Sequence, residues 1–196
     1  MIAGHFGLAA GVKSRAPATP LWLLMLACQW LDVVFVVLFA AHLEGLAMVP
    51  GAPDGAYGGA VIHAYYTHSL VGAAVLSIVL GGAAAWRYGR RSGVVVGLVA
   101  FSHWILDVVM HRPDMPLLPG DGGPPLLGFG LWRSPAASAA LELVIVVAGA
   151  AMYWRAARSL APGAPGSPDT MRRANRCGAL VLGAGLLTLG LNVAGL

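Results

Sequence analysis

The chain has 196 residues, of which 58% are hydrophobic and only 10% are charged, and its formal net charge is +4. Soluble domains carry about 25% charged residues, so this composition excludes a soluble globular protein and indicates an all-α, polytopic membrane protein. The basic residues flank apolar runs, so the positive charge indicates membrane topology and not nucleic-acid binding.

The first apolar segment, Met1–Val12, contains His5 and is followed by the basic residues Lys13 and Arg15. A membrane-spanning helix needs about 20 apolar residues, so this segment is too short to cross. We expect a half-helix that packs into the bundle of spans.

Five later apolar runs are long enough to span, which makes residues 1–196 a single integral membrane domain. Thr19 and Pro20 predict the start of the first span as N-cap and first helical residue. Ser92 is expected to open the third span, and Ser134 with Pro135 the fourth. The predicted spans cover residues 21–43, 60–86, 93–110, 135–154 and 177–196.

Two connections are long and rich in glycine and proline. One covers residues 49–59, and the other covers residues 112–134 and contains five prolines. The second shows no clear periodicity, and long loops of this kind are often functional.

The basic residues predict the orientation of the five spans. Ten of the 12 Lys and Arg residues fall on one side, and only Arg112 and Arg133 fall on the other. The side with more Lys and Arg is normally cytoplasmic. We therefore expect a bacterial-type inner membrane protein with its N-terminus inside, and with its C-terminus and both long loops outside.

Ionisable side chains within the spans are energetically costly and therefore indicate function. His103 and Asp107 are four residues apart, so they share a helix face. His68 has a similar depth on the neighbouring span. The ionisable residues predicted within the spans are Asp32, His63, His68, His103, Asp107 and Glu142.

Histidine nitrogens and carboxylate oxygens at one depth suit a divalent ion, and zinc in particular. We expect His68, His103 and Asp107 to be the ligands of first choice, and Asp32, His63 and His5 those of second choice. His63 reaches the site only from a loop or a distorted first turn, because it lies about 140° from His68 on a regular helix.

Expectations for Asp32, Glu142, His111 and His42 complete this set. Asp32 or Glu142 could act as a general base. His111 lies about 12 Å from His103 along a helix, too far to share one ion. His111, like His42 near the end of the first span, is expected to be hydrogen-bonded and structural.

The same residues resemble the YdjM-like inner-membrane proteins, a family described as membrane-bound metal-dependent hydrolases, some of whose members are labelled permeases. The resemblance covers about residues 1–120. Two differences bear on a second metal and on anion binding: Val34 replaces a second aspartate, and Ala64–Tyr65 replace Arg-Gly. The matching elements are Gly4–His5, Asp32, His63, Thr67–Leu70, Ser102–His103, Asp107 and Pro116–Leu118.

These observations predict a hydrolase that acts from the outer side on a lipid or a lipid-linked ester, with Arg112 and Arg133 available to bind a phosphate. A small transporter, permease or ion-conducting protein is the alternative, because intramembrane His and Asp also carry protons and ions. Haem between histidines is a third possibility. The bilayer and a lipid-like substrate are the expected partners, and the sequence leaves the oligomeric state open.

Overall fold

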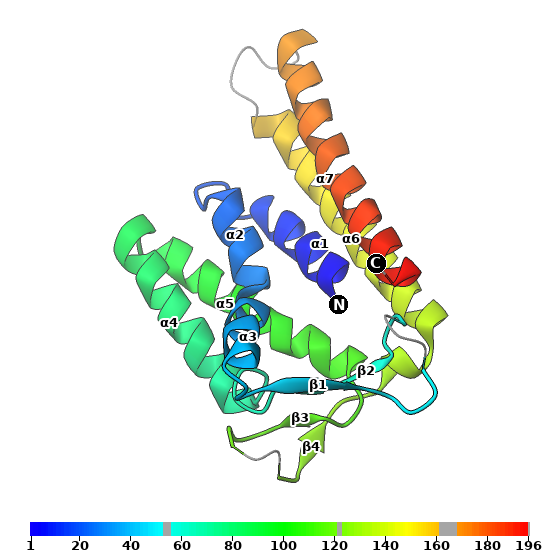
Figure 1. Ribbon diagram of the computed structural model, residues 1–196. Coiled ribbons are helices and arrows are strands. Elements are labelled where there is room, and N and C mark those ends of the chain that lie inside the picture. The colour runs from blue at the N-terminus through cyan, green and yellow to red at the C-terminus, as the bar shows by residue number, and fades with distance from the viewer. Residues whose placement is uncertain (53–55, 121–122, 161–167, 196) are drawn as a thin grey trace.

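The computed structural model describes residues 1–52, 56–120, 123–160 and 168–195. These residues form a bundle of helices with two small two-stranded sheets at one end (Figure 1), which confirms the predicted all-α class. The elements are α1 (Ile2–Lys13), α2 (Leu21–Cys28), α3 (Trp30–Ala40), β1 (Gly45–Met48), β2 (Ala60–His63), α4 (Leu70–Tyr88), α5 (Arg90–Met110), β3 (Met115–Pro116), β4 (Leu126–Leu127), the 3₁₀ turn η1 (Leu131–Arg133), α6 (Pro135–Leu160) and α7 (Pro168–Ala194).

Four of these helices, α4 to α7, are long and apolar enough to cross a membrane. The pair α2 and α3 makes a fifth candidate if it is counted as one span, although it bends by 52° at Gln29. The expected first span, residues 21–43, is therefore broken in its middle. This break exposes backbone carbonyl groups at the depth of the polar residues.

The second span begins later than predicted, at Leu70 instead of residue 60. Ser69 caps α4, with its hydroxyl oxygen accepting a hydrogen bond from Gly72 N at 3.0 Å. The residues before this cap form β2, which pairs antiparallel with β1. β-branched Val61 and Ile62 favour this extended conformation.

The second long connection also contains short strands, because β3 pairs antiparallel with β4.

The other helices also begin or end at residues that differ from the predicted span boundaries. α5 begins at Arg90, after Gly89 with φ of 86°, and α7 begins at Pro168 instead of residue 177. α6 starts at Pro135 as predicted and continues to Leu160.

The predicted N-cap role of Thr19 is wrong. Pro20 occupies the N-cap position of α2 without a side-chain cap. The Thr19 hydroxyl instead donates to Ser92 Oγ at 3.1 Å. Ser92 lies inside α5 and does not open it, so these two residues join the first and third predicted spans.

The N-terminal segment is helical and packed into the bundle, as predicted. α1 contacts α2, α6 and α7, and Figure 1 shows it inside the group of longer helices. The approach to α6 is close because it is made by glycines: a Cβ added at Gly149 would lie 1.8 Å from the carbonyl oxygen of Gly7. This contact fixes the position of His5 at the centre of the molecule.

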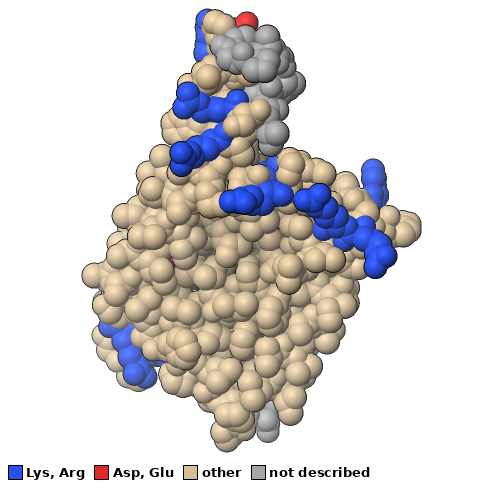
Figure 2. Space-filling model, turned by 180° about the vertical axis from the view of Figure 1, so that it is seen from behind, with Lys and Arg blue, Asp and Glu red and all other residues tan. Residues whose placement is uncertain are grey.

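Basic side chains gather at the end of the bundle that carries the α1–α2 and α4–α5 connections, the end of α6 and the start of α7 (Figures 1 and 2). The four strands lie at the opposite end. The two ends thus differ in charge, as the positive-inside rule requires. Which end is cytoplasmic stays a prediction.

Candidate metal centre

α5 contributes the two central residues of the polar cluster. His103 is 0% exposed and Asp107 is 3% exposed, and both lie on the face of α5 that points into the bundle. His103 Nε2 is 3.0 Å from Asp107 Oδ2. The four-residue spacing therefore places the pair as the sequence predicted.

His68 reaches the cluster because it lies directly before the Ser69 cap of α4. Its ring is buried, and its carbonyl oxygen accepts a hydrogen bond from Trp104 Nε1 at 2.9 Å. The cap ends the extended segment and starts the helix at one residue, so it fixes the direction of His68 towards α5. His68 Nε2 is 3.3 Å from His103 Nε2.

A buried carboxylate orients His68 through a hydroxyl group. Glu44 Oε1 accepts hydrogen bonds from the backbone N–H groups of Tyr66 and Thr67, each at 2.8 Å. Thr67 Oγ1 lies 2.9 Å from Glu44 Oε2 and 2.8 Å from His68 Nδ1. Because a carboxylate only accepts, the hydroxyl donates to Glu44 and accepts from His68 Nδ1–H. Glu44 was not among the predicted site residues, although its position at the end of an apolar run is a signal in the sequence.

The break between α2 and α3 supplies two further groups. The carbonyl oxygen of Cys28, at the end of α2, lies 2.7 Å from His103 Nδ1 and accepts its hydrogen. In the first turn of α3, Asp32 places Oδ1 3.4 Å from His68 Nε2 and 3.5 Å from His103 Nε2. Its side chain is 40% exposed, so Asp32 is the accessible member of the cluster.

His5 enters from α1. Its ring stacks on the ring of His103, with centroids 3.8 Å apart, and its Nε2 lies 3.0 Å from Asp107 Oδ1. The second nitrogen, Nδ1, is buried and has no hydrogen-bond partner among the described residues. His5 therefore holds one oxygen of Asp107, while the other oxygen faces His68 and His103.

The separations between the converging atoms match those of a metal site. Four atoms meet: His68 Nε2, His103 Nε2, Asp32 Oδ1 and Asp107 Oδ2. Their five measured separations run from 3.0 to 3.5 Å. A tetrahedral ion with bonds of about 2.0–2.1 Å requires ligand atoms about 3.3–3.4 Å apart. These side chains could therefore hold a metal ion.

The hydrogen bonds made by Nδ1 of His68 and of His103 leave the Nε2 atom of both rings free to bind an ion. Because Nδ1–H of His68 and of His103 is used for Thr67 and Cys28, the neutral imidazoles carry lone pairs on Nε2. Two such lone pairs 3.3 Å apart repel each other unless a cation lies between them. A proton on one Nε2 would pair that nitrogen with Asp32 or Asp107, whereas a metal ion would bind both nitrogens and both carboxylates at once.

His111 lies at the edge of this cluster. Its Nε2 is 3.7 Å from Asp107 Oδ2, and its Nδ1 is 2.9 Å from Asp114 Oδ1. On its other side, the Trp132 ring lies 4.4 Å away between centroids. The sequence analysis treated His111 as a separate structural residue because it assumed a continuous helix, but α5 ends at Met110.

Three predicted site residues are placed elsewhere. His63 ends β2, where its Nδ1 lies 2.6 Å from the Tyr65 hydroxyl, and no contact among the described residues joins it to the cluster. Arg112 Nη1 donates to Gly58 O at 2.6 Å and fastens the first long connection. Arg133 is exposed in η1, directly after Trp132.

Glu142 is hydrogen-bonded to Gly4 and Tyr57, and not to a residue of the His and Asp cluster, where a general base was expected. It is fully buried in α6, where Oε2 accepts from Gly4 N at 2.9 Å and Oε1 accepts from the Tyr57 hydroxyl. Burial, together with Glu142, raises the pKa of Tyr57, so the hydroxyl stays a donor. Glu142 therefore caps the first turn of α1, where a negative charge is favourable, and holds His5 in place.

The fold and this cluster define a polytopic α-helical membrane protein with a buried His and Asp centre that could hold a metal ion. Comparison with protein-family models, with curated proteins and with solved structures finds no match. The resemblance to YdjM-like proteins stays a prediction.

Proposed function

We propose that this protein is a membrane-embedded, metal-dependent hydrolase. Its ion, which we expect to be zinc, is held by His68, His103 and Asp107, with Asp32 at the accessible corner. A bound divalent ion supplies Lewis acidity, which polarises an ester or phosphoryl oxygen and acidifies water. The observation that carries the proposal is the pair of Nε2 atoms of His68 and His103, 3.3 Å apart and flanked by two carboxylates.

The ligand residues have unequal exposure, which suits catalysis better than a purely structural role. Structural zinc sites are closed, whereas catalytic sites keep one position open to water or substrate. Here His68, His103 and Asp107 are buried, but Asp32 is 40% exposed. Asp32 can therefore move away from the fourth position and accept a proton there as a general base.

The place of the site suggests a lipid or lipid-linked ester as substrate. His103 and Asp107 lie on α5, which is long and apolar enough to cross a bilayer, in its last two turns before the segment that leads to β3. Arg112 and Arg133 are the only Lys or Arg residues between Arg91 and Arg155 in the sequence. Their guanidinium groups could bind a phosphorylated headgroup, and Trp132 next to Arg133 contacts His111 at the edge of the cluster.

Metal analysis and an ester-hydrolysis assay of the purified protein test the proposal together. We expect about one zinc per chain, and hydrolysis of a fluorogenic phospholipid in mixed micelles that stops with a chelator and returns with zinc. His68→Asn, His103→Asn and Asp107→Asn should each lose both the metal and the activity.

His42→Asn is the matched control. His42 is exposed and has a positive φ of 58°, which asparagine tolerates, so this variant should keep the metal and the activity. Absence of metal in the wild type, or a haem absorbance, would reject the proposal. Bound metal without hydrolysis of any ester, combined with metal movement into proteoliposomes, would favour the transporter alternative.

A further inference from the structure

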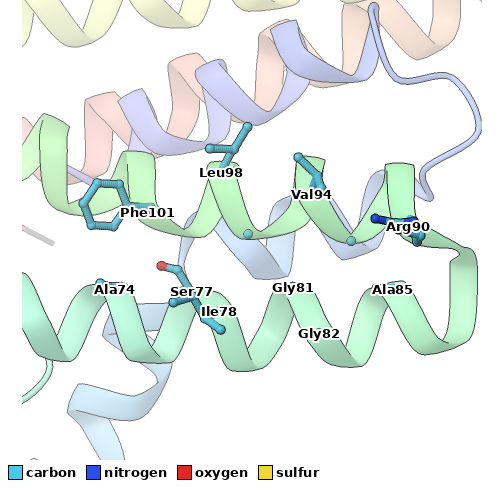
Figure 3. A pocket seen from close by; sticks show the side chains of 12 residues that line it. Ala74, Ser77, Ile78, Gly81, Gly82, Ala85, Arg90, Val94, Leu98 and Phe101 are labelled. Carbon is cyan, nitrogen blue, oxygen red and sulfur yellow. The ribbon is translucent and has the colours of Figure 1, made fainter.

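A long apolar groove runs between α4 and α5 on the outer surface of the bundle, away from the His and Asp cluster. It has a volume of about 580 Å³, within the roughly 300–1,000 Å³ of typical ligand sites. Figure 3 shows its walls, which include Ile78 on α4, and Val94 and Leu98 on α5. Gly82 also lines it and leaves open space, because no atom lies within 4 Å of its Cβ position.

The groove has the length of one half of a bilayer. It extends along α5 from Arg90 to Phe101, which is about 16 Å at 1.5 Å per residue. Half of a hydrocarbon core of about 30 Å is about 15 Å. One acyl chain that starts at the level of Arg90 would therefore reach the middle of the membrane along this groove.

Positive charge surrounds the mouth of the groove. Arg90 lines it, and Arg87 and Arg91 are exposed beside it at the α4–α5 turn. None of the three has an acidic partner among the described residues. At this basic end the only described carboxylate is Asp169, whose one ion pair is with Arg172. The mouth is thus a cationic site without an anion of its own.

One polar group lies deeper in the groove. Ser77 is 4% exposed and lines the groove, and its Oγ has no hydrogen-bond partner among the described residues. Figure 3 shows its hydroxyl on the wall between the two helices. Ser77 lies beside Gly97, about 10 Å from Arg90 along α5. The groove therefore presents a cation at its mouth and apolar walls beyond it, in the same order as the phosphate and the hydrocarbon chain of a phospholipid.

We propose that this groove is a specific binding site for one anionic phospholipid, with its phosphate at Arg90 and an acyl chain that runs along Gly82 and past Ser77 to Phe101. A helix from a second copy is a worse occupant. Two copies inserted in the same orientation would bring their Arg87, Arg90 and Arg91 side chains together, and this repulsion is not compensated by any described acid there.

Native mass spectrometry of the full-length protein, released from nanodiscs that contain equal amounts of phosphatidylglycerol and phosphatidylcholine, tests this site. The wild type should retain one phosphatidylglycerol in preference to phosphatidylcholine. Gly82→Leu should abolish retention by filling the groove, and Gly183→Leu is its control because Gly183 on α7 also has open space. Arg90→Gln should weaken the preference about five-fold, whereas Arg155→Gln, also at the basic end, should not.

Two results would overturn the proposal. If Gly82→Leu and Gly183→Leu retain lipid equally, the bound lipid is bilayer lipid that adheres without specificity, and the groove is not a binding site. If Gly82→Leu converts a dimer to a monomer, the groove is an interface between copies. Both readouts are independent of metal binding and of hydrolysis, so failure of the proposed enzymatic activity would not affect them.

Discussion

Replacing Thr67 by valine separates a metal centre from a purely structural cluster of histidines. The substitution keeps the shape of the side chain but removes the hydroxyl that links Glu44 to His68. That hydroxyl is 2.8 Å from His68 Nδ1 and 2.9 Å from Glu44 Oε2. Without it, the buried Nδ1–H has no acceptor when Nε2 binds the ion.

The size of the effect follows from this loss. A buried donor without a partner costs about 1–3 kcal/mol, and the metal-free protein escapes this cost when the proton moves to Nε2. The cost of the unpaired Nδ1–H therefore falls on the metal-bound state alone, whereas Glu44 Oε2 loses its hydroxyl donor in both states. We expect zinc to bind Thr67→Val about 10–100-fold more weakly, in addition to a loss of stability that is the same with and without metal.

Competition with a chromogenic chelator of known zinc affinity measures this change. Thr188→Val is the control, because the exposed Thr188 hydroxyl donates only to Ala184 O in its own helix, α7. An affinity of Thr67→Val within about twofold of wild type would refute the role of the Glu44–Thr67 pair in orienting a ligand.

Three more predictions test the contacts that position α1 and the membrane topology. Tyr57→Phe removes one of two described donors to Glu142 and should lower stability by about 1–3 kcal/mol in thermal unfolding, while zinc affinity changes little. Gly149→Ala places a Cβ against the backbone of α1 and should cost at least about 1–3 kcal/mol, visible as aggregation or a lower melting temperature. Arg91→Cys and Leu118→Cys, at exposed positions, should react with an impermeant reagent from opposite sides of the membrane. If both cysteines react from the same side, the predicted topology is wrong.

The sequence by itself determined the helical membrane class, the approximate spans and the core of the site. Hydropathy and helical spacing are local properties, so they act on neighbouring residues regardless of the rest of the fold. His103 and Asp107 share a face because one helix turns once in 3.6 residues. His68 followed from the same kind of argument about depth.

The predicted span boundaries were wrong where a helix cap or strand pairing outweighed hydropathy. Residues 60–63 are apolar enough for a span, yet they form β2 because Ser69 starts α4 later and β1 offers a pairing partner. The break at Gln29 was also invisible, because both flanking segments are apolar. It is this break that gives His103 its acceptor at Cys28.

Only the tertiary structure decided which polar groups meet. Glu44 and Thr67 are 23 residues apart, His5 and Asp107 are 102 apart, and Gly4 and Glu142 are 138 apart. Such pairs depend on how helices pack, and the glycine contact between α1 and α6 sets that packing for the N-terminal segment. No local period encodes it, so the sequence could not predict that Glu142 pairs with the N-terminus of α1.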